Sequence, residues 1–478
     1  GRNRDEPDAH RLEDPAVERE IELRALHQYL RLKYVPGPLT MFNGVNKLPP
    51  AHMMICENGH TSLEQYWDVD YSRKLNLTEE EWEERVLALL QDAVRLRLVT
   101  DMPLGALLSG GIDSSLIVSL MQQSTEHPIK TFSIGFEAQS HNELPYARQV
   151  AEHVGADYHE EFVRPDAVDV LPTLVQHYGE PFGDDSCIPT YYLAQMAREH
   201  VTVALSGDGG DESFGGYPRV ARLANFGPAH SLYGLFSQEV RRVVSSERLL
   251  NALLDRERWR AFKDELSFRI SEILDPTERY LNQWGVWRGT NGQLLSPEIL
   301  QALDGEDCFG FVDKVWQDTK SWHPVDRILY LELLTYLPYD LQVKMDIASM
   351  AVSLEVRSPF LDHRLVELAA AMPPKLKLRN GDTKILLRRV ARRMLPQRIV
   401  ARPKMGFSIP RADWLRGDMK PMVYDLLLDG TARQRGIFQP DVVHRMVQQH
   451  MAGDPGYDRY IWLMLNFELW CRLFLDRS

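Results

Sequence analysis

The stretch LLSGGIDSS, from Leu107 to Ser115, places two glycines, an aspartate and three serines between two apolar runs. The run before it (103–108) predicts a buried strand, and the run after it (116–121) predicts a helix. Glycine lets the backbone approach an anion closely, and the N–H groups at a helix start point toward such an anion. The turn is therefore typical of a phosphate site, with Mg²⁺ bridging Asp113 to the phosphate. Taken alone, a glycine turn with a Ser/Asp helix cap explains the stretch equally well.

Strand and helix patterns alternate around this turn. The strand patterns lie at 103–109, 130–136, 157–163 and 201–207, and the helix patterns between them lie at 114–123, 142–154, 167–178 and 189–200. This βαβ series predicts an α/β fold with a doubly wound parallel sheet. Thr78 and Glu81 form the pattern of a capping box at the start of a further helix. Beyond Tyr217 the strand signals nearly vanish, so we expect a large helical C-terminal portion.

Composition excludes several classes of protein. The 478 residues carry a net charge of -13, which disfavours a protein that binds nucleic acid. The four cysteines are widely spaced, which argues against a structural zinc site and a disulfide framework and suits a reducing, cytoplasmic setting. No signal peptide is expected at the start. The apolar run 461–475 contains charged residues and predicts a buried C-terminal helix. No membrane-spanning segment is therefore expected.

A second glycine-rich turn follows a second predicted strand. The sequence VALSGDGGDESFGGY (203–217) carries acids at Asp208, Asp211 and Glu212. Because the carboxyl ends of parallel strands lie at one edge of a sheet, this turn can face the first one across a crevice. An acidic loop on a solvated edge is the alternative.

The first turn is not a GxxxxGK[ST] loop, because no lysine follows its glycines. It resembles the SGGxDS loop of N-type ATP pyrophosphatases, which have a HUP-like fold. The combination LLSGGIDSS, TFSIGF, SGDGGDESFGGY, SLEVRSPFLDH and RPKMGF resembles glutamine-hydrolysing asparagine synthetases from about residue 29 to the C-terminus. The resemblance implies three parts: the tail of a glutaminase-type domain and a linker (1–75), the ATP pyrophosphatase core (76–225) and the helical remainder of the synthetase domain (226–478).

The resemblance also implies roles for individual residues. ATP would be bound by Leu107, Ser109, Gly110, Gly111, Asp113, Ser114, Ser115, Ile134, Ser206 and Gly207. Mg²⁺ would be held by Asp113 and Asp211, and the catalytic residues would be Lys404, Asp208 and Glu355. Glu355 would be a buried acid near the substrate, although a salt bridge to Arg357 explains it equally well. Lys404 follows a stretch rich in Lys and Arg. Most of these charged residues are explained by a helix face that is exposed to solvent.

The implied reaction is ATP-dependent amide formation. A carboxylate, with aspartate as the first choice, would be adenylated, and ammonia would then release the amide, AMP and pyrophosphate. A paralogue that amidates a larger acid or joins an amine substrate is an alternative, as is a tRNA-modifying ATP pyrophosphatase or a non-catalytic scaffold. The resemblance leaves a homodimer open.

The sequence departs from the family in three places. One is Asp208, which gives SGDG where asparagine-forming members often read SGEG. The family's glutaminase uses an N-terminal cysteine, whereas residue 1 is Gly and the first cysteine is Cys56. We therefore expect ammonia from a glutaminase domain or partner, and turnover of this chain with ammonium rather than glutamine. The turn near Asp184 and Asp185 carries acids where asparagine-forming members offer an arginine. We therefore expect a substrate less anionic than free aspartate, or one whose carboxylate meets Arg357 or Lys344 instead.

Overall fold

The computed structural model describes residues 19–135, 143–163, 167–224, 275–284, 294–402, 404, 406–407 and 409–476. The polar start of the chain (1–18) and the stretches 225–274 and 285–293 of the expected helical portion lie outside these ranges. So do Pro403 and Met405 of the RPKMGF stretch.

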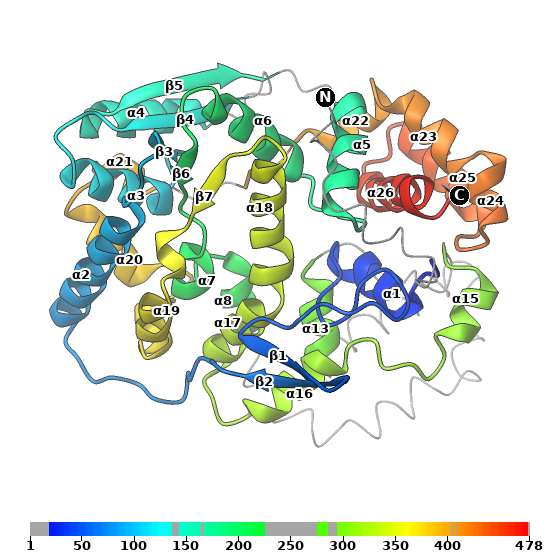
Figure 1. The fold of residues 1–478 in the computed structure, drawn as a ribbon, viewed down its shortest axis with the longest axis horizontal. Helices are drawn as coiled ribbons and strands as arrows, with labels where there is room; N and C mark the ends of the chain where they lie inside the picture. The colour runs from blue at the N-terminus through cyan, green and yellow to red at the C-terminus, as the bar shows by residue number, and fades with distance from the viewer. Residues whose placement is uncertain are drawn as a thin grey trace, which may run out of the picture.

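Five parallel strands form the central sheet, in the order β5-β4-β3-β6-β7 (Figure 1). Their bounds are β3 (Leu104–Leu107), β4 (Lys130–Gly135), β5 (Asp157–Phe162), β6 (Val203–Leu205) and β7 (Glu355–Arg357). β3 pairs with β4 on one side and with β6 on the other, so the winding direction reverses between β3 and β6. This order confirms the doubly wound α/β fold, and it places the ends of β3 and β6 at the switch point, where such folds bind ligands.

β7 is the strand that the sequence did not indicate. It is three residues long and follows a helical run, and it forms because Val203 and Leu205 of β6 pair with Glu355 and Arg357. Such a strand depends on its neighbour rather than on local propensity. The segment after residue 225 therefore contributes an edge strand to the sheet, in addition to the helices that were expected there.

Helices pack on both faces of the sheet (Figure 1). One set is α2 (Glu79–Arg97), α3 (Ile112–Gln123), α4 (Leu144–Val154), α19 (His363–Ala370), α20 (Ile385–Arg392) and α21 (Gln397–Val400), which share one hydrophobic cluster. The other set includes α5 (Ala167–Tyr178), α6 (Cys187–Arg198), α17 (Pro324–Leu334) and α18 (Gln342–Met350), which belong to a second cluster. The expected capping box is present at the start of α2, where Thr78 and Glu81 bond reciprocally.

The remaining described elements are short helices and one long C-terminal helix. They are α1 (Leu23–Leu32), α7 (Gly210–Phe214), α8 (Pro218–Ala224), α13 (Pro276–Asn282), α15 (Pro297–Ala302), α16 (Gly310–Asp318), η3 (Leu337–Leu341), η4 (Pro359–Leu361), η5 (Pro374–Leu376), α22 (Arg411–Arg416), α23 (Lys420–Leu427), α24 (Gly430–Gln434), α25 (Pro440–Met451) and α26 (Asp458–Phe474).

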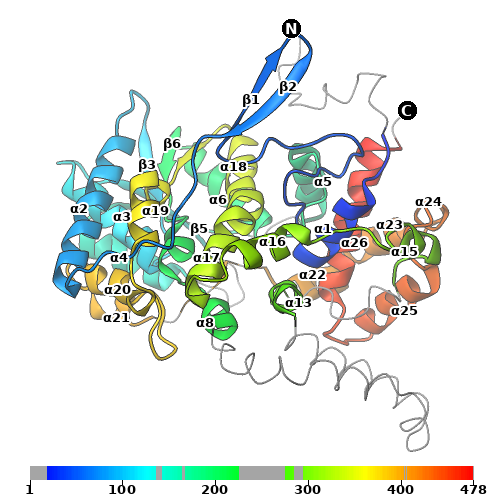
Figure 2. The same cartoon turned by 90° about the horizontal axis from the view of Figure 1, so that it is seen from below.

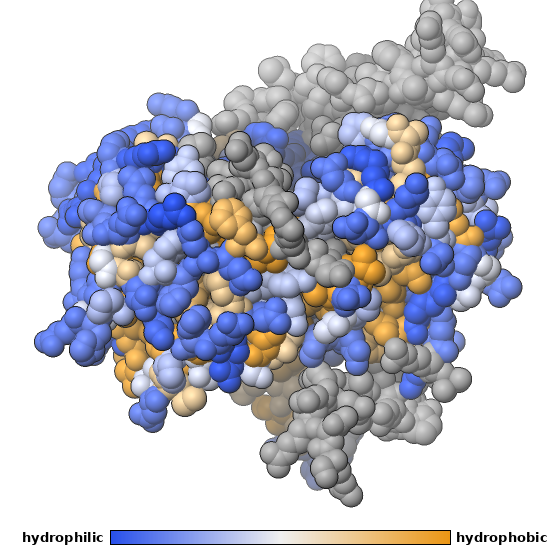
Figure 3. Space-filling view, turned by 90° about the horizontal axis from the view of Figure 1, so that it is seen from above, coloured by the Kyte–Doolittle hydropathy of each residue, from blue (hydrophilic) through white to orange (hydrophobic). Residues whose placement is uncertain are grey.

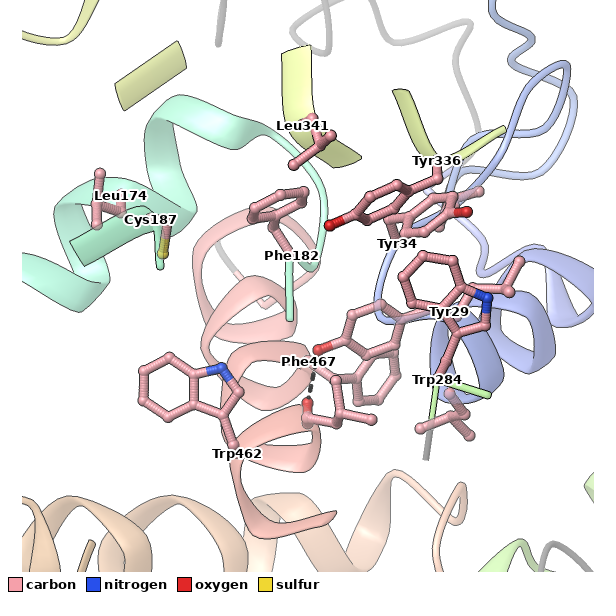
Figure 4. Packing of buried hydrophobic residues seen from close by; sticks show 14 of the residues in the cluster. Tyr29, Tyr34, Leu174, Phe182, Cys187, Trp284, Tyr336, Leu341, Trp462 and Phe467 are labelled. Carbon is pink, nitrogen blue, oxygen red and sulfur yellow. Dashed lines mark hydrogen bonds between the residues drawn. The ribbon is translucent and has the colours of Figure 1, made fainter. Parts of the chain in front are cut away.

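The C-terminal helix α26 is buried, as the sequence predicted. Trp462, Phe467 and Trp470 are almost fully enclosed, and the hydroxyl of Tyr29 in α1 donates a hydrogen bond of 2.9 Å to the Leu463 carbonyl (Figure 4). The N-terminal segment is thereby anchored to the C-terminal helices. Among the described residues, no helix combines the length and the apolar character needed to cross a bilayer.

A hairpin before α2 projects from the body of the molecule (Figure 2). It consists of β1 (His52–Glu57) and β2 (His60–Gln65), joined by a tight turn in which Asn58 and Gly59 both have positive φ. The hairpin is largely exposed along both strands. On the opposite side of the molecule, hydrophobic side chains gather between two largely hydrophilic lobes (Figure 3).

Candidate active site

The turn between β3 and α3 is closed by its own serines. The Ser109 and Ser114 hydroxyls lie 3.0 Å apart, and the Gly111 N–H donates to the Ser109 hydroxyl over 3.2 Å. Gly110 has a φ of 69°, and a Cβ there would lie 2.6 Å from the backbone of Tyr146, so only glycine fits. The turn therefore presents hydroxyls and the N-terminus of α3, a combination suited to phosphate.

The turn after β6 packs directly on the turn after β3. A Cβ on Gly207 would lie 2.6 Å from the Ser114 nitrogen, and a Cβ on Gly210 would lie 2.7 Å from the Asp113 carboxyl carbon. Glycine at these positions thus allows the two turns to touch. Contact between the turns brings Asp113 of the first turn close to Asp211 of the second.

Two lysines neutralise this pair of acids. The Lys384 ammonium forms an ion pair of 2.5 Å with Asp211 and also bonds Asp113, and Lys404 bonds the other oxygen of Asp211. Burial alone would raise the pKa of Asp211, but the two ammonium groups hold it below its ordinary value. Burial opposes the charge of Lys384 as well, yet the two carboxylates raise its pKa to about 12. Lys384 is therefore a permanent cation between the two acids.

The acid pair fits a magnesium ion that also binds phosphate. Asp113 Oδ1 is buried and accepts no hydrogen bond within the described part of the chain, whereas Asp211 Oδ1 contacts the Lys384 ammonium. In the part of the chain that the structure describes, no group of three or more His, Cys, Asp or Glu side chains is placed to hold a metal ion by itself. Mg²⁺ commonly takes one or two carboxylates and completes its shell with water and substrate phosphates. Asp113 and Asp211 meet that requirement.

Both turns open into a cavity of about 430 Å³. The predicted site residues in its lining are Leu107, Ser109, Gly111, Asp113, Ser114, Ile134, Ser206, Gly207, Asp208, Asp211 and Lys404. Gly110 and Ser115 do not line the cavity: Gly110 packs against α4, and Ser115 is fully buried in the first turn of α3. The structure thus brings together most of the residues implied by the resemblance, although they come from four separate parts of the chain.

Glu355 also lies outside the lining, and its exposure corrects the expectation of a buried acid. It begins β7 with 55% of its side chain exposed, pairs with Arg357 at 2.7 Å and is not part of the cavity lining. Residues two apart on a strand point to the same side, which makes this ion pair a local consequence of strand formation. The expected buried acid is thus an exposed, ion-paired one.

Several lining residues were not among the predicted site residues. Lys384 is the most consequential, and Arg402 is another: it donates to the Ser109 carbonyl over 3.2 Å and to Glu143 over 2.5 Å. These contacts hold the turn after β3 against α4. The basic stretch at 384–404 is the signal for these two residues in the sequence, and nothing in that stretch distinguishes them from exposed cations.

Charged residues of both signs line the cavity in addition to the acid pair and its two lysines. Asp184, Asp185 and Asp208 line it together with Lys344, whereas Arg357 is absent from the lining. Burial raises the pKa of Asp208. Burial opposes the charge of Lys344, but its neighbours Asp184, Asp340 and Asp208 raise its pKa above the ordinary value.

Comparison with known proteins agrees with this geometry. The sequence model of the asparagine synthase family matches residues 85–472, and that of a glutamine amidotransferase domain matches residues 8–67. An asparagine synthetase [glutamine-hydrolyzing] 1 of Bacillus subtilis is 29% identical over 96% of this chain and 70% of its own length. A putative asparagine synthetase of Mycobacterium tuberculosis is 31% identical over 96% and 69%, and the amidase chyE of Penicillium rubens is 27% identical over 86% and 65%.

Proposed function

This chain belongs to the asparagine synthase family and is an ATP-dependent amide-forming ligase, and we propose that it adenylates a small amino-acid carboxylate, with aspartate as the first choice. The observation that carries the proposal is the meeting of two glycine-rich turns at the switch point of the sheet. That contact places Asp113, Asp211, Lys384 and Lys404 around one point of the cavity.

The nucleotide would lie across the ends of β3 and β6. Leu107 and Ile134 offer apolar surface for the adenosine, and Ser206 and Gly207 lie beside them in the lining. The phosphates would meet the hydroxyls of Ser109 and Ser114 and the N-terminus of α3. Asp113 and Asp211 would hold Mg²⁺, which supplies positive charge beside the phosphates when it is bound.

In the first step, a carboxylate oxygen of the acid attacks the α-phosphorus of ATP. The bond to the β-phosphate oxygen breaks, and the products are an acyl-adenylate and pyrophosphate. Negative charge grows on the departing pyrophosphate, so the ammonium groups of Lys404 and Lys384 are placed to stabilise it. In the second step, ammonia attacks the acyl carbon, the bond to AMP breaks and the nitrogen loses a proton. The products are an amide and AMP.

The nitrogen would come from glutamine through an amidotransferase domain. Residues 8–67 match such a domain, and they include the exposed hairpin β1–β2. Met53, Met54, Ile55 and Leu63 of this hairpin are large apolar residues open to solvent. Met54 and Leu63 are paired across the hairpin and share one face. We take that face as the surface on which the rest of an amidotransferase domain packs, because exposed apolar side chains of this kind mark protein contacts.

A second candidate function is amidation of a larger carboxylic acid. It is favoured by Asp208, which lines the cavity, forms no ion pair with a described residue and would disfavour a small substrate that carries two carboxylates. Relatives that carry the name amidase accompany those named asparagine synthetase. The two candidates differ only in the acid, so one substrate panel decides between them.

The test is acid-dependent formation of AMP and pyrophosphate, with ammonium chloride and then glutamine as the nitrogen source. We expect formation of the amide, AMP and pyrophosphate with ammonium as the nitrogen source. Asp113→Asn should abolish turnover, whereas Asp92→Asn, which alters an exposed ion-paired acid on α2, should not. Release of ADP and phosphate, or no turnover with any acid in the panel, would contradict the proposal.

A further inference from the structure

The ring of Tyr217 supports the ammonium group of Lys404. Tyr217 ends the glycine-rich turn after β6, and both residues line the cavity. The Lys404 ammonium lies 4.3 Å from the centre of the Tyr217 ring, and it also bonds Asp211. The face of an aromatic ring attracts a cation, more strongly where water is excluded. An ammonium has three N–H donors, so Lys404 can contact the ring, Asp211 and an anion in the cavity at the same time.

Tyr217 is placed beside the acid pair by its neighbours in the chain. A Cβ on Gly216 would lie 2.4 Å from Lys384 Cε, so glycine at this position lets the backbone pass close to the acids immediately before Tyr217. The Tyr217 hydroxyl donates a hydrogen bond to Glu212, which follows Asp211 in α7. The ring is thereby tied to the short helix that carries one of the two metal-binding acids.

Arg219, two residues further along, is enclosed by aromatic rings. Its guanidinium carbon lies 3.8 Å from the centre of the Tyr217 ring and 4.7 Å from the ring centres of Trp284 and Tyr336. Trp284 and Tyr336 are buried and contact each other, with ring centres 4.5 Å apart (Figure 4). A guanidinium is planar and packs against such rings in a way that an ammonium cannot reproduce. Arg219 therefore joins Tyr217 to two rings of the hydrophobic core.

A buried carboxylate fixes Arg219 from a second helix. Arg219 belongs to α8, and its Nε donates a hydrogen bond of 2.7 Å to Glu332 of α17, whose side chain is fully buried. Arg219 Nη2 is also buried and donates no hydrogen bond to a described residue. Arg219 lies outside the lining that the described residues form around the cavity, whereas Tyr217 and Tyr336 belong to it. The contacts of Arg219 with these two rings therefore link it to the site.

We propose that Tyr217 holds the Lys404 ammonium where it meets pyrophosphate, and that Arg219 is a positioning residue that fixes the Tyr217 ring. This inference rests on the proposed function, in which Lys404 stabilises the departing pyrophosphate. A metal ion on Asp211 would compete with Lys404 for that carboxylate, whereas the ring of Tyr217 would stay available to the ammonium. Removal of the ring should therefore weaken the contribution of Lys404.

The experiment measures binding of inorganic pyrophosphate in the presence of Mg²⁺ by isothermal titration calorimetry, which needs no acid substrate. Tyr217→Leu removes the ring, Tyr217→Phe keeps the ring without the hydroxyl, and Arg219→Lys keeps the charge without the planar group. Each change is made in the wild type and in the Lys404→Met background. Arg327→Lys is the matched control, because the Arg327 guanidinium lies 4.7 Å from the centre of a tryptophan ring outside the cavity lining.

Tyr217→Leu should weaken binding of Mg²⁺-pyrophosphate about 2- to 30-fold, the range for a lost cation–π contact. Tyr217→Phe should bind like the wild type, because a phenylalanine ring also attracts a cation. Arg219→Lys should weaken binding by a smaller factor, since the ring is present but less firmly held, and Arg327→Lys should not change it. Lys404→Met should weaken binding by itself. In its background the other changes should have no further effect, because a residue that acts through Lys404 has nothing left to position.

Additive losses from Tyr217→Leu and Lys404→Met would overturn the proposal, because the ring would then act independently of Lys404. Equal losses from Tyr217→Phe and Tyr217→Leu would overturn it as well, since the hydroxyl rather than the ring would be needed. An equal loss from Arg327→Lys would show a general effect on stability and exclude a specific role for Arg219.

Failure of the proposed function gives a different result. A wild type that binds Mg²⁺-pyrophosphate with the expected dependence on Tyr217, but forms no AMP from ATP, ammonium chloride and any acid, would contradict the proposed function and leave the positioning roles in place. A wild type that does not bind Mg²⁺-pyrophosphate would overturn both proposals.

Discussion

Removal of Lys384 isolates the electrostatic role of the acid pair. In Lys384→Met, Asp113 loses its ion partner, whereas Asp211 keeps Lys404. Removing one partner of a buried ion pair lowers the free energy of unfolding by about 3–5 kcal/mol. Because Lys404 still pairs with Asp211, we expect a loss of about 3 kcal/mol for this variant, at the lower end of that range. The two carboxylates then form a site of net negative charge. Without nucleotide, Mg²⁺ should restore stability, by about 2.7 kcal/mol at 100 times its Kd.

The assay is urea unfolding followed by tryptophan fluorescence, with and without Mg²⁺ and in the absence of ATP. Lys377→Met is the matched control. Lys377 is fully buried and bonds Asp326 at 3.1 Å, and Asp326 keeps Lys74 at 2.8 Å when Lys377 is removed. That cluster lies outside the cavity lining. We expect Mg²⁺ to raise the unfolding midpoint of Lys384→Met strongly. It should raise the midpoints of the wild type and of Lys377→Met equally weakly, because in both of them Lys384 competes with the ion.

An equal response of the two variants to Mg²⁺ would refute this reasoning. It would mean that the carboxylates of Asp113 and Asp211 do not form a metal site, and that Lys384 has only a structural role. A wild type more responsive than Lys384→Met would refute it as well, because the lysine would then assist rather than compete with the ion.

Three further predictions follow from the same contacts. Lys404→Met should lower kcat by more than it weakens ATP binding, since its charge acts most on the departing pyrophosphate; an effect on ATP affinity alone would contradict this. Asp211→Asn should abolish formation of AMP while near-ultraviolet circular dichroism stays native, and full turnover by the folded variant would exclude a metal role. Burial lowers the pKa of His27 to about 4 from 6.5, so the native state resists protonation that the unfolded state accepts. Stability should therefore fall by about 3 kcal/mol between pH 6.5 and 4, and His27→Phe should remove this slope in urea titrations.

The sequence predicted those parts of the site whose residues lie close together along the chain. The glycines and serines around Asp113 occupy one turn, and their spacing predicted both the turn and its place after a strand. The strand β6 and the acids after it were predicted in the same way, from a strand pattern followed by a glycine-rich turn. The doubly wound sheet was therefore predictable from the alternation of patterns, as was the buried helix α26.

What could not be predicted depends on contacts between distant residues. Lys384 lies 271 positions from Asp113, and only the folded chain brings the two together. β7 forms because β6 offers it a free edge, and its three residues carry no signal of their own. The same strand leaves Glu355 exposed beside Arg357, so the ion pair is present and the expected burial is not. The ion pair of Lys384, the strand β7 and the exposure of Glu355 all depend on contacts between distant parts of the chain rather than on residue type.

Transfer of oxygen from the substrate carboxylate to AMP tests directly whether an acyl-adenylate forms. The acid is supplied with ¹⁸O in the reacting carboxylate, together with ATP and ammonium chloride, and AMP is analysed by mass spectrometry. An acyl-adenylate passes one carboxylate oxygen to the phosphate, so the account predicts AMP that carries one ¹⁸O and unlabelled pyrophosphate. Unlabelled AMP would contradict attack of the carboxylate on the α-phosphorus, and ADP with labelled phosphate would show attack at the γ-phosphate instead.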